Sequence, residues 1–354
     1  DLTNYATMFN VLGVAPVFTI EVGLGTTVQA GQVAGFAVST PGSILDVSVL
    51  PAITITTYLN DVEQQSVNGD FLDLAWSEDW QSEKAKNKPI FVLFHGLEGC
   101  FYSPYANGLM HAFAKNGWLS VMMHFRGCSG KPNNLARAYH SGEVEDARLF
   151  LQHLDSLFPN QTKVAVGISL GGNMLANYLA QYNQEPLLDA ATIVSAPLDL
   201  SACSQRIEQG FSKIYKTYLL SSLKRNALRK HHLLKGELDL SYQSIKRVTK
   251  LYEFDDLITA PLHGFKDAQD YYQRCSGIHR LKDIKLPTQI IHAKDDPFMT
   301  EDVIPKYVLP DNIDYRLFDQ GGHVGFVAGS ALKPKFWLEE ALPAYYESLS
   351  AKRQ

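Results

Sequence analysis

The stretch Lys163–Ala176, KVAVGISLGGNMLA, decides the fold of this chain. An apolar run at 164–166 leads into GISLG at 167–171, and a helical pattern opens directly after it. The G-x-S-x-G spacing at a strand-to-helix turn is typical of a nucleophile elbow, a tight turn that exposes its serine, here Ser169, above a sheet. The string alone arises by chance in roughly one chain in ten of this length, so the flanking strand and helix carry the prediction. A glycine-rich phosphate-binding turn is the alternative.

Apolar β-like runs alternate with amphipathic helical stretches on both sides of this motif. The alternation predicts an α/β fold with a mostly parallel central sheet flanked by helices. The expected strands lie at 71–76, 90–95, 118–125, 163–168, 190–195, 288–293 and 314–318. The expected helices lie at 105–115, 143–157, 170–181 and about 334–349.

The alternation stops between Ser195 and Thr288, where the sequence has helical patterns and no convincing strand. Connections in α/β units are usually 2–6 residues long, so this segment is an insertion. Insertions at the carboxyl ends of parallel strands lie over the active site. We therefore predict one domain at 61–354 with a helical cap at about 198–285. The cap aromatics either line an acyl pocket or pack in the core, and they are Phe211, Tyr215, Tyr218, Tyr271 and Tyr272.

The composition is that of an ordinary folded protein, with 354 residues, 45% hydrophobic and 19% charged. A net charge of −5 excludes the basic surface that nucleic-acid binding requires. The basic stretch Lys224–Lys235 indicates a solvated helix face or a patch toward anionic lipid or substrate. Residues 1–60 form an atypical N-terminal segment, since positions 1–57 hold only Asp1, Glu21 and Asp46 as charged residues.

The four cysteines are widely spaced and form no CxxC pair. Reduced thiols in a chain of this length favour a cytoplasmic protein over a disulfide framework. A membrane span needs about 20 predominantly apolar residues, and we expect none. Peripheral contact of an amphipathic cap with lipid stays open. The sequence does not indicate an oligomeric state.

A serine hydroxyl needs a base to act as a nucleophile near neutral pH, and the base needs an acid to orient it. At a nucleophile elbow the chain order is serine, then acid, then histidine. His323 stands in the glycine-rich loop GGHVGF after a predicted strand and is the candidate base. The acid is Asp296 or Asp295, and we favour Asp296 because it lies one residue farther beyond the strand end.

Two backbone N–H groups are expected to stabilise the anionic tetrahedral intermediate. They belong to Leu170, which follows the serine, and to Leu97, in the loop His95-Gly96-Leu97-Glu98-Gly99 after the strand at 90–95. His95 is expected to stabilise that loop by packing. The pair His231-His232 has no HExxH or Cys/His spacing around it, so we expect no metal and no cofactor.

Many ordered blocks together make this chain similar to the YheT-like α/β hydrolases, bacterial relatives of eukaryotic abhydrolase-domain proteins that act on acyl esters and lipids. The resemblance covers about Asn68 to Leu342. Its blocks are FLDLAWSE, FHGLEG, SPYA, HFRGCSG, YHSGE, GISLGGNML, VSAPLDL, EFDDLITAPLHGF, IIHAKDDPFM and GGHVGF. The resemblance implies Ser169, Asp296 and His323 as the catalytic set. Residues 1–60 depart from it, because the polar HLQT-like motif of the family is absent there.

The predicted activity is hydrolysis of carboxylic esters, lipid and acylglycerol esters among them, through an acyl-enzyme intermediate. Two other functions are compatible with the same residues. An acyltransferase uses an alcohol or thiol acceptor in place of water, and a binding protein uses the pocket without catalysis. Fold alone does not separate these functions.

Overall fold

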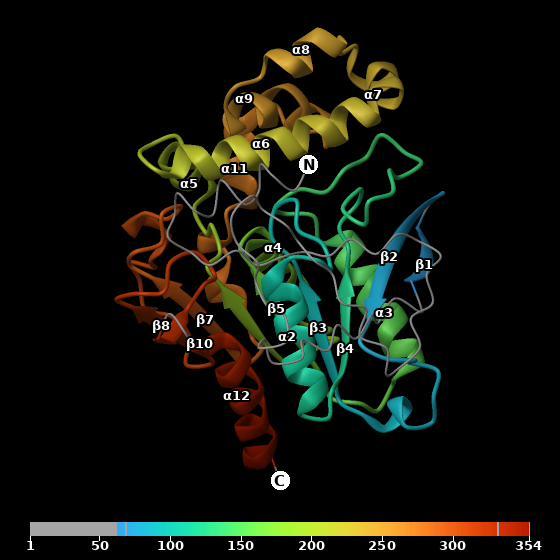
Figure 1. The fold of residues 1–354 in the computed structure, drawn as a ribbon, viewed down its shortest axis with the longest axis vertical. Coiled ribbons are helices and arrows are strands. Elements are labelled where there is room, and N and C mark those ends of the chain that lie inside the picture. The colour runs from blue at the N-terminus through green and yellow to red at the C-terminus, as the bar shows by residue number, and fades with distance from the viewer. Residues whose placement is uncertain (1–61, 68, 331–332, 354) are drawn as a thin grey trace, which may run out of the picture. The chain divides into compact units, whose positions relative to one another are not determined.

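The computed structural model describes residues 62–67, 69–330 and 333–353 of the chain. Their main feature is an eight-stranded sheet in the order β1-β2-β4-β3-β5-β6-β7-β8 (Figure 1). The strands from β3 to β8 run parallel, and β1 and β2 are antiparallel at one edge. The predicted α/β fold class is therefore confirmed.

The strands of the sheet are β1 Val62–Val67, β2 Asp70–Trp76, β3 Ile90–Phe94, β4 Leu119–Met123, β5 Lys163–Ile168, β6 Ala190–Val194, β7 Thr288–Ala293 and β8 Ile313–Phe318. The helices that flank it are α2 Pro104–Lys115, α3 Glu145–Leu157, α4 Leu170–Gln181 and α12 Trp337–Arg353. Between β6 and β7 lie α5 Leu200–Arg206, α6 Ser212–Arg229, α7 His231–Leu238, α8 Tyr242–Arg247, α9 Leu251–Phe254, α10 Ala260–Leu262 and α11 Ala268–Cys275.

Both faces of the sheet are covered by helices. Successive side chains of a strand point to opposite faces, and β3 shows this alternation. Phe91 and Leu93 pack with side chains of α2 and α12, whereas Val92 and Phe94 pack with side chains of α3 and α4. A strand buried on both faces is largely apolar, which explains the unbroken run IFVLF in β3.

The insertion between β6 and β7 forms a separate helical layer. Residues 195–287, every one of which the structure describes, contain helices and turns but no strand. Helices α6 to α9 share a small apolar cluster of their own that includes Leu220, Leu234, Ile245 and Phe254. Figure 1 shows α6 running between the sheet and helices α8 and α9. The helices from α5 to α11 all lie within the predicted cap limits of 198–285.

The C-terminal prediction is wrong at its start. The sequence predicts a final helix from about Pro334 to Leu349. Instead α12 begins at Trp337, and Pro334 lies in β10 (Lys333–Phe336), which pairs antiparallel with β9 (Val327–Ser330). This two-stranded ribbon is exposed, so its sequence lacks the apolar alternation that marks a strand. The N-terminal segment predicted at 1–60 lies outside the described residues.

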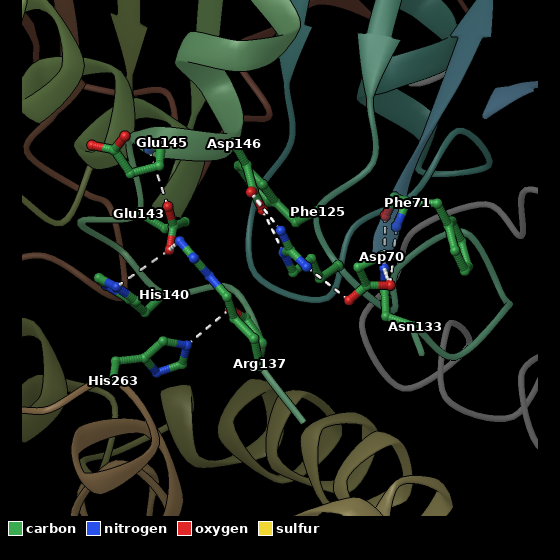
Figure 2. A network of polar contacts seen from close by, with 12 residues as sticks. Asp70, Phe71, Phe125, Asn133, Arg137, His140, Glu143, Glu145, Asp146 and His263 are labelled. Atoms are coloured by element: carbon green, nitrogen blue, oxygen red, sulfur yellow. Dashed lines mark hydrogen bonds and ion pairs between the residues drawn. The ribbon is translucent and has the colours of Figure 1, made fainter. Parts of the chain in front are cut away.

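A buried ion network joins β2, the loop after β4 and α3. The Arg126 guanidinium donates two hydrogen bonds to Asp146, at 2.7 and 2.8 Å, and one to Asp70, at 2.7 Å. Figure 2 shows the Asp70 and Asp146 carboxylates pointing toward one another in this network. Asn133 Nδ2 donates to Asp70 at 2.9 Å. Arg126 belongs to the HFRGCSG block, which therefore connects β2 and α3 through buried ion pairs.

Replacing Arg126 by leucine is expected to lower the free energy of unfolding by about 3–5 kcal/mol, because Asp70 and Asp146 would remain buried without their cation. Both carboxylates are at most 3% exposed, so water cannot replace the arginine. Urea unfolding monitored by circular dichroism measures the loss. Arg316→Leu is the control, since Arg316 pairs with Asp314 and both side chains are more than 40% exposed. Its expected cost is below about 1 kcal/mol, and equal losses would contradict the prediction.

Candidate active site

Ser169 occupies the turn between β5 and α4 in a strained backbone conformation. Its φ of 51° and ψ of −119° are uncommon for a residue with a side chain, and such conformations cost about 1–3 kcal/mol. The Ser169 N–H donates to the Val194 carbonyl oxygen of β6 at 2.8 Å. This hydrogen bond to the sheet therefore stabilises the turn in which Ser169 has a strained conformation.

The glycines of the motif are required by close backbone approach. A Cβ on Gly167 would lie 2.5 Å from the Gly171 carbonyl oxygen. A Cβ on Gly171 would lie 2.4 Å from the carbonyl oxygens of both Phe94 and His95. These distances are shorter than any normal carbon–oxygen contact. The turn into α4 therefore closes only if position 167 lacks a side chain, and α4 packs against the end of β3 only if position 171 lacks one.

The structure brings Ser169, Asp296 and His323 together. The His323 Nε2 atom lies 3.0 Å from Ser169 Oγ, and His323 Nδ1 lies 2.8 Å from Asp296 Oδ2. The three residues follow β5, β7 and β8, whose carboxyl ends meet at one edge of the parallel sheet. Asp296 is buried, and its other oxygen accepts a hydrogen bond from the Phe298 N–H at 2.9 Å. A carboxylate only accepts hydrogen bonds, so Nδ1 carries the proton and Nε2 is left to accept from the serine.

The two adjacent aspartates, which the sequence left as alternatives, have different contacts. Asp295 Oδ1 accepts from the Gly321 and Gly322 N–H groups, each at 2.8 Å. Asp295 therefore fixes the start of the loop that carries His323, while Asp296 contacts the imidazole itself.

Phe298 contacts His323 directly, and Ser195 contacts the residue that follows it; neither was predicted as a site residue. The Phe298 ring centroid lies 4.3 Å from that of His323 in an edge contact. The Val324 N–H points to Ser195 Oγ at 3.4 Å, and Ser195 and Val324 both have positive φ, 48° and 68°. Strained residues thus gather around the histidine as well as at the serine.

The loop after β3 passes directly beside Ser169. A Cβ on Gly96 would lie 3.3 Å from Ser169 Cβ. Leu97 follows in this loop, and Leu170 is the first residue of α4, whose leading N–H groups have no partner within the helix. Both predicted oxyanion donors therefore belong to backbone next to the serine.

His95 stabilises this loop through two hydrogen bonds to the backbone. It is fully buried, its Nδ1 donates to the Gly96 carbonyl oxygen at 2.8 Å, and its Nε2 accepts from the Phe125 N–H at 3.0 Å. Burial, with repulsion from His124, lowers the pKa of His95 to about 3. A neutral imidazole that accepts one hydrogen bond and donates another is consistent with the predicted structural role.

The cap aromatics divide into two groups. Tyr271 and Tyr272 are buried, and their hydroxyl groups bond to Ser141 and Asp255. The interpretation as core therefore applies to these two, and the acyl-pocket interpretation is wrong for them. Phe211, Tyr215 and Tyr218 are exposed, and the centroid of the Tyr215 ring lies 5.1 Å from that of Phe298.

Among the described residues, no group of three or more His, Cys, Asp or Glu side chains is arranged to hold a metal ion. Within the same part of the chain, none of the helices has both the length and the apolar character to cross a membrane.

Comparisons with known proteins identify the family and the fold of this chain. The sequence model of the family described as alpha/beta hydrolase fold matches residues 89–330. The chain is 54% identical over 277 residues to "Putative esterase YheT" of Escherichia coli, covering 78% of this chain and 81% of that protein. It is 28% identical to mouse "Phospholipase ABHD3", covering 75% of this chain and 66% of the relative. Among solved structures, Est1E of Butyrivibrio proteoclasticus superposes with a TM-score of 0.51 at 11% identity, covering 82% of this chain and 99% of that one.

Proposed function

Because this chain belongs to the alpha/beta hydrolase fold family, we propose that it is a serine hydrolase that cleaves carboxylic esters through an acyl-enzyme intermediate. The observation that carries the proposal is the hydrogen-bond chain from Ser169 through His323 to Asp296, with distances of 3.0 and 2.8 Å. A serine, a base and a buried acid in this order are the requirements for nucleophilic catalysis.

In the acylation step, Ser169 Oγ attacks the ester carbonyl carbon while His323 Nε2 takes the hydroxyl proton. Asp296 accepts the Nδ1 hydrogen bond, which keeps the imidazole in the required tautomer and stabilises the imidazolium that forms. The negative charge that develops on the carbonyl oxygen is stabilised by the Leu97 and Leu170 N–H groups. The carbon–oxygen ester bond then breaks, and His323 gives its proton to the departing alcohol.

In the deacylation step, a water molecule takes the place of the alcohol. His323 Nε2 accepts a proton from this water, whose oxygen attacks the acyl carbon. The tetrahedral intermediate collapses to the free acid, and the proton returns to Ser169 Oγ. The same residues therefore act twice, and the enzyme returns to its starting protonation state.

An acyl ester with an apolar chain is the proposed substrate class. The relatives above are named as an esterase and a phospholipase. The exposed ring of Tyr215 contacts Phe298, whose own ring contacts His323. This apolar surface next to the base suits an acyl chain better than a polar group, because apolar area removed from water lowers the free energy of binding.

Hydrolysis of p-nitrophenyl esters from acetate to laurate tests this proposal. We expect turnover by the wild type, with a chain-length optimum beyond acetate. A fluorophosphonate should add one phosphonyl group per chain, on the peptide that contains Ser169. Turnover without labelling of that peptide would reject Ser169 as the nucleophile, and a folded protein with neither reaction would favour a binding role.

Acyl transfer is distinguished in the same assay. Adding an alcohol acceptor at increasing concentration should leave the free acid as the main product if water is the natural acceptor. A switch of the product from acid to new ester at low alcohol concentration would favour an acyltransferase.

A further inference from the structure

Helix α6 contacts two loops of the candidate active site through side-chain hydrogen bonds. Near its start, Ser212 Oγ donates to the Pro297 carbonyl oxygen at 2.6 Å. Near its end, Asn226 Nδ2 donates to Glu98 Oε2 at 2.6 Å. With about 1.5 Å of rise per residue, these two contacts lie roughly 21 Å apart along the helix. Pro297 directly follows Asp296 and Glu98 directly follows Leu97, so one cap helix reaches both sides of the site.

The loop that contains Leu97 is held on both sides of that residue. The Gly96 N–H donates to the Tyr105 hydroxyl at 2.8 Å, and the Glu98 N–H donates to the Tyr139 hydroxyl at 2.8 Å. The Tyr139 hydroxyl in turn donates to Glu98 Oε1 at 2.8 Å. The Leu97 N–H has no hydrogen-bond partner within the described residues. Its direction therefore depends on how firmly its two neighbours are fixed.

Glu98 is the member of this loop that connects to the cap. Its backbone has a positive φ of 56°, a conformation that costs energy and persists only where surrounding contacts enforce it. One carboxylate oxygen is held by Tyr139 and the other by Asn226 of α6. Burial raises the pKa of the Glu98 carboxyl, so this side chain is not an ordinary solvated surface acid. The contact joins residues 128 positions apart in the sequence.

We propose that Glu98 is a positioning residue that couples cap helix α6 to the Leu97 N–H through its hydrogen bond with Asn226. The inference rests on the proposed function, in which the Leu97 N–H stabilises the oxyanion. When α6 is seated, Asn226 fixes the Glu98 side chain and Tyr139 fixes the Glu98 backbone, so the Leu97 N–H is held toward the reacting carbonyl. When α6 moves away, the loop loses one of these restraints. The cap thereby controls the chemical step as well as access.

Steady-state kinetics of Asn226→Ala and Glu98→Gln with a p-nitrophenyl ester test the coupling. Asn226→Ala removes the donor. Glu98→Gln keeps the volume but has one acceptor oxygen where the carboxylate has two, so it cannot accept from both Tyr139 and Asn226. We expect kcat to fall by about 10-fold in each, less than the ~10²–10³-fold cost of deleting an oxyanion donor. KM should change by less than about 2-fold, because an interaction made only in the transition state is lost. Affinity for a trifluoromethyl ketone, which forms an anionic hemiketal with the serine, should fall in parallel with kcat.

The double variant and a control on the same helix complete the test. If both residues act through one bond, the kcat of the double variant Glu98→Gln with Asn226→Ala should lie within about 2-fold of the kcat of the more impaired single variant. Thr217→Ala is the control, because Thr217 is exposed and its hydroxyl bonds only to the Lys213 carbonyl of its own helix. Thermal unfolding of every variant reports any general loss of cap stability.

Three outcomes overturn the coupling. An unchanged kcat with a raised KM or a lowered melting temperature would mean that Asn226 only anchors the cap. Losses that multiply in the double variant would mean that the two residues act independently. Full activity of Ser169→Ala, or no activity of the folded wild type, would instead reject the proposed function and the coupling with it.

Discussion

Ser169→Ala is expected to lower kcat for p-nitrophenyl ester hydrolysis by about 10⁴-fold or more. The variant loses the Ser169 hydroxyl, whose oxygen lies 3.0 Å from His323 Nε2, so no acyl-enzyme can form. A residual rate above the uncatalysed one should remain, since oxyanion stabilisation and substrate binding persist without the nucleophile. The rate of p-nitrophenolate release at saturating ester measures the loss.

Ser195→Ala is the matched control for this variant. Ser195 is also a serine with positive φ at the carboxyl end of a parallel strand, β6, and it is also buried close to the site. Its hydroxyl makes one long contact, 3.4 Å from the Val324 N–H, and loss of such a bond is worth about 1 kcal/mol. We expect less than a 10-fold loss of kcat. Comparable losses in the two variants would point to damage of the strand ends and not to removal of a nucleophile.

The central elements of the fold could be predicted from the sequence because their patterns depend on burial and backbone crowding of neighbouring residues. The expected ranges 163–168, 170–181 and 288–293 coincide with β5, α4 and β7. Two of these are strands of a sheet covered on both faces and are buried at every position, and the apolar runs Val164–Val166 in β5 and Ile290–Ile291 in β7 mark them in the sequence. The glycines at 167 and 171 mark the turn because any side chain there would collide with backbone. Buried strands and crowded turns are therefore specified by residues that are consecutive in the sequence.

The contacts of the cap depend on residues that are far apart in the sequence. The spacing of residues within a short motif does not predict such contacts. Nothing in the sequence pairs Asn226 with Glu98 or Ser212 with Pro297, because each pair joins a cap helix to a loop of the catalytic domain. The start of α12 was mispredicted for a related reason. Pro334 is as favourable in a first helical turn as on the exposed edge of a ribbon, and the pairing with Gly329 decided between them.

Asp296→Asn is expected to lower kcat by about 10³–10⁴-fold while leaving the fold intact. An asparagine amide can turn its N–H₂ toward His323 Nδ1, which would then have to accept a hydrogen bond. The proton would move to Nε2, the atom that must accept from Ser169, and the base would be in the wrong tautomer. The carboxylate also stabilises the imidazolium from a position with no solvent exposure, where water cannot replace it. KM should change little, because Asp296 supports the base and does not contact the ester.

The neighbouring aspartate provides the control for this prediction. Asp295→Asn retains a side-chain oxygen that can accept from the Gly321 and Gly322 N–H groups, so the loop before His323 should keep its path. We expect a loss below about 10-fold, because both hydrogen bonds are exposed to solvent and the asparagine oxygen can still accept them. A larger loss in Asp295→Asn than in Asp296→Asn would assign the acid to Asp295 and contradict the geometry. Because the two residues are adjacent in one loop, a difference of two or more orders of magnitude between variants with the same melting temperature would identify the carboxylate that contacts the imidazole.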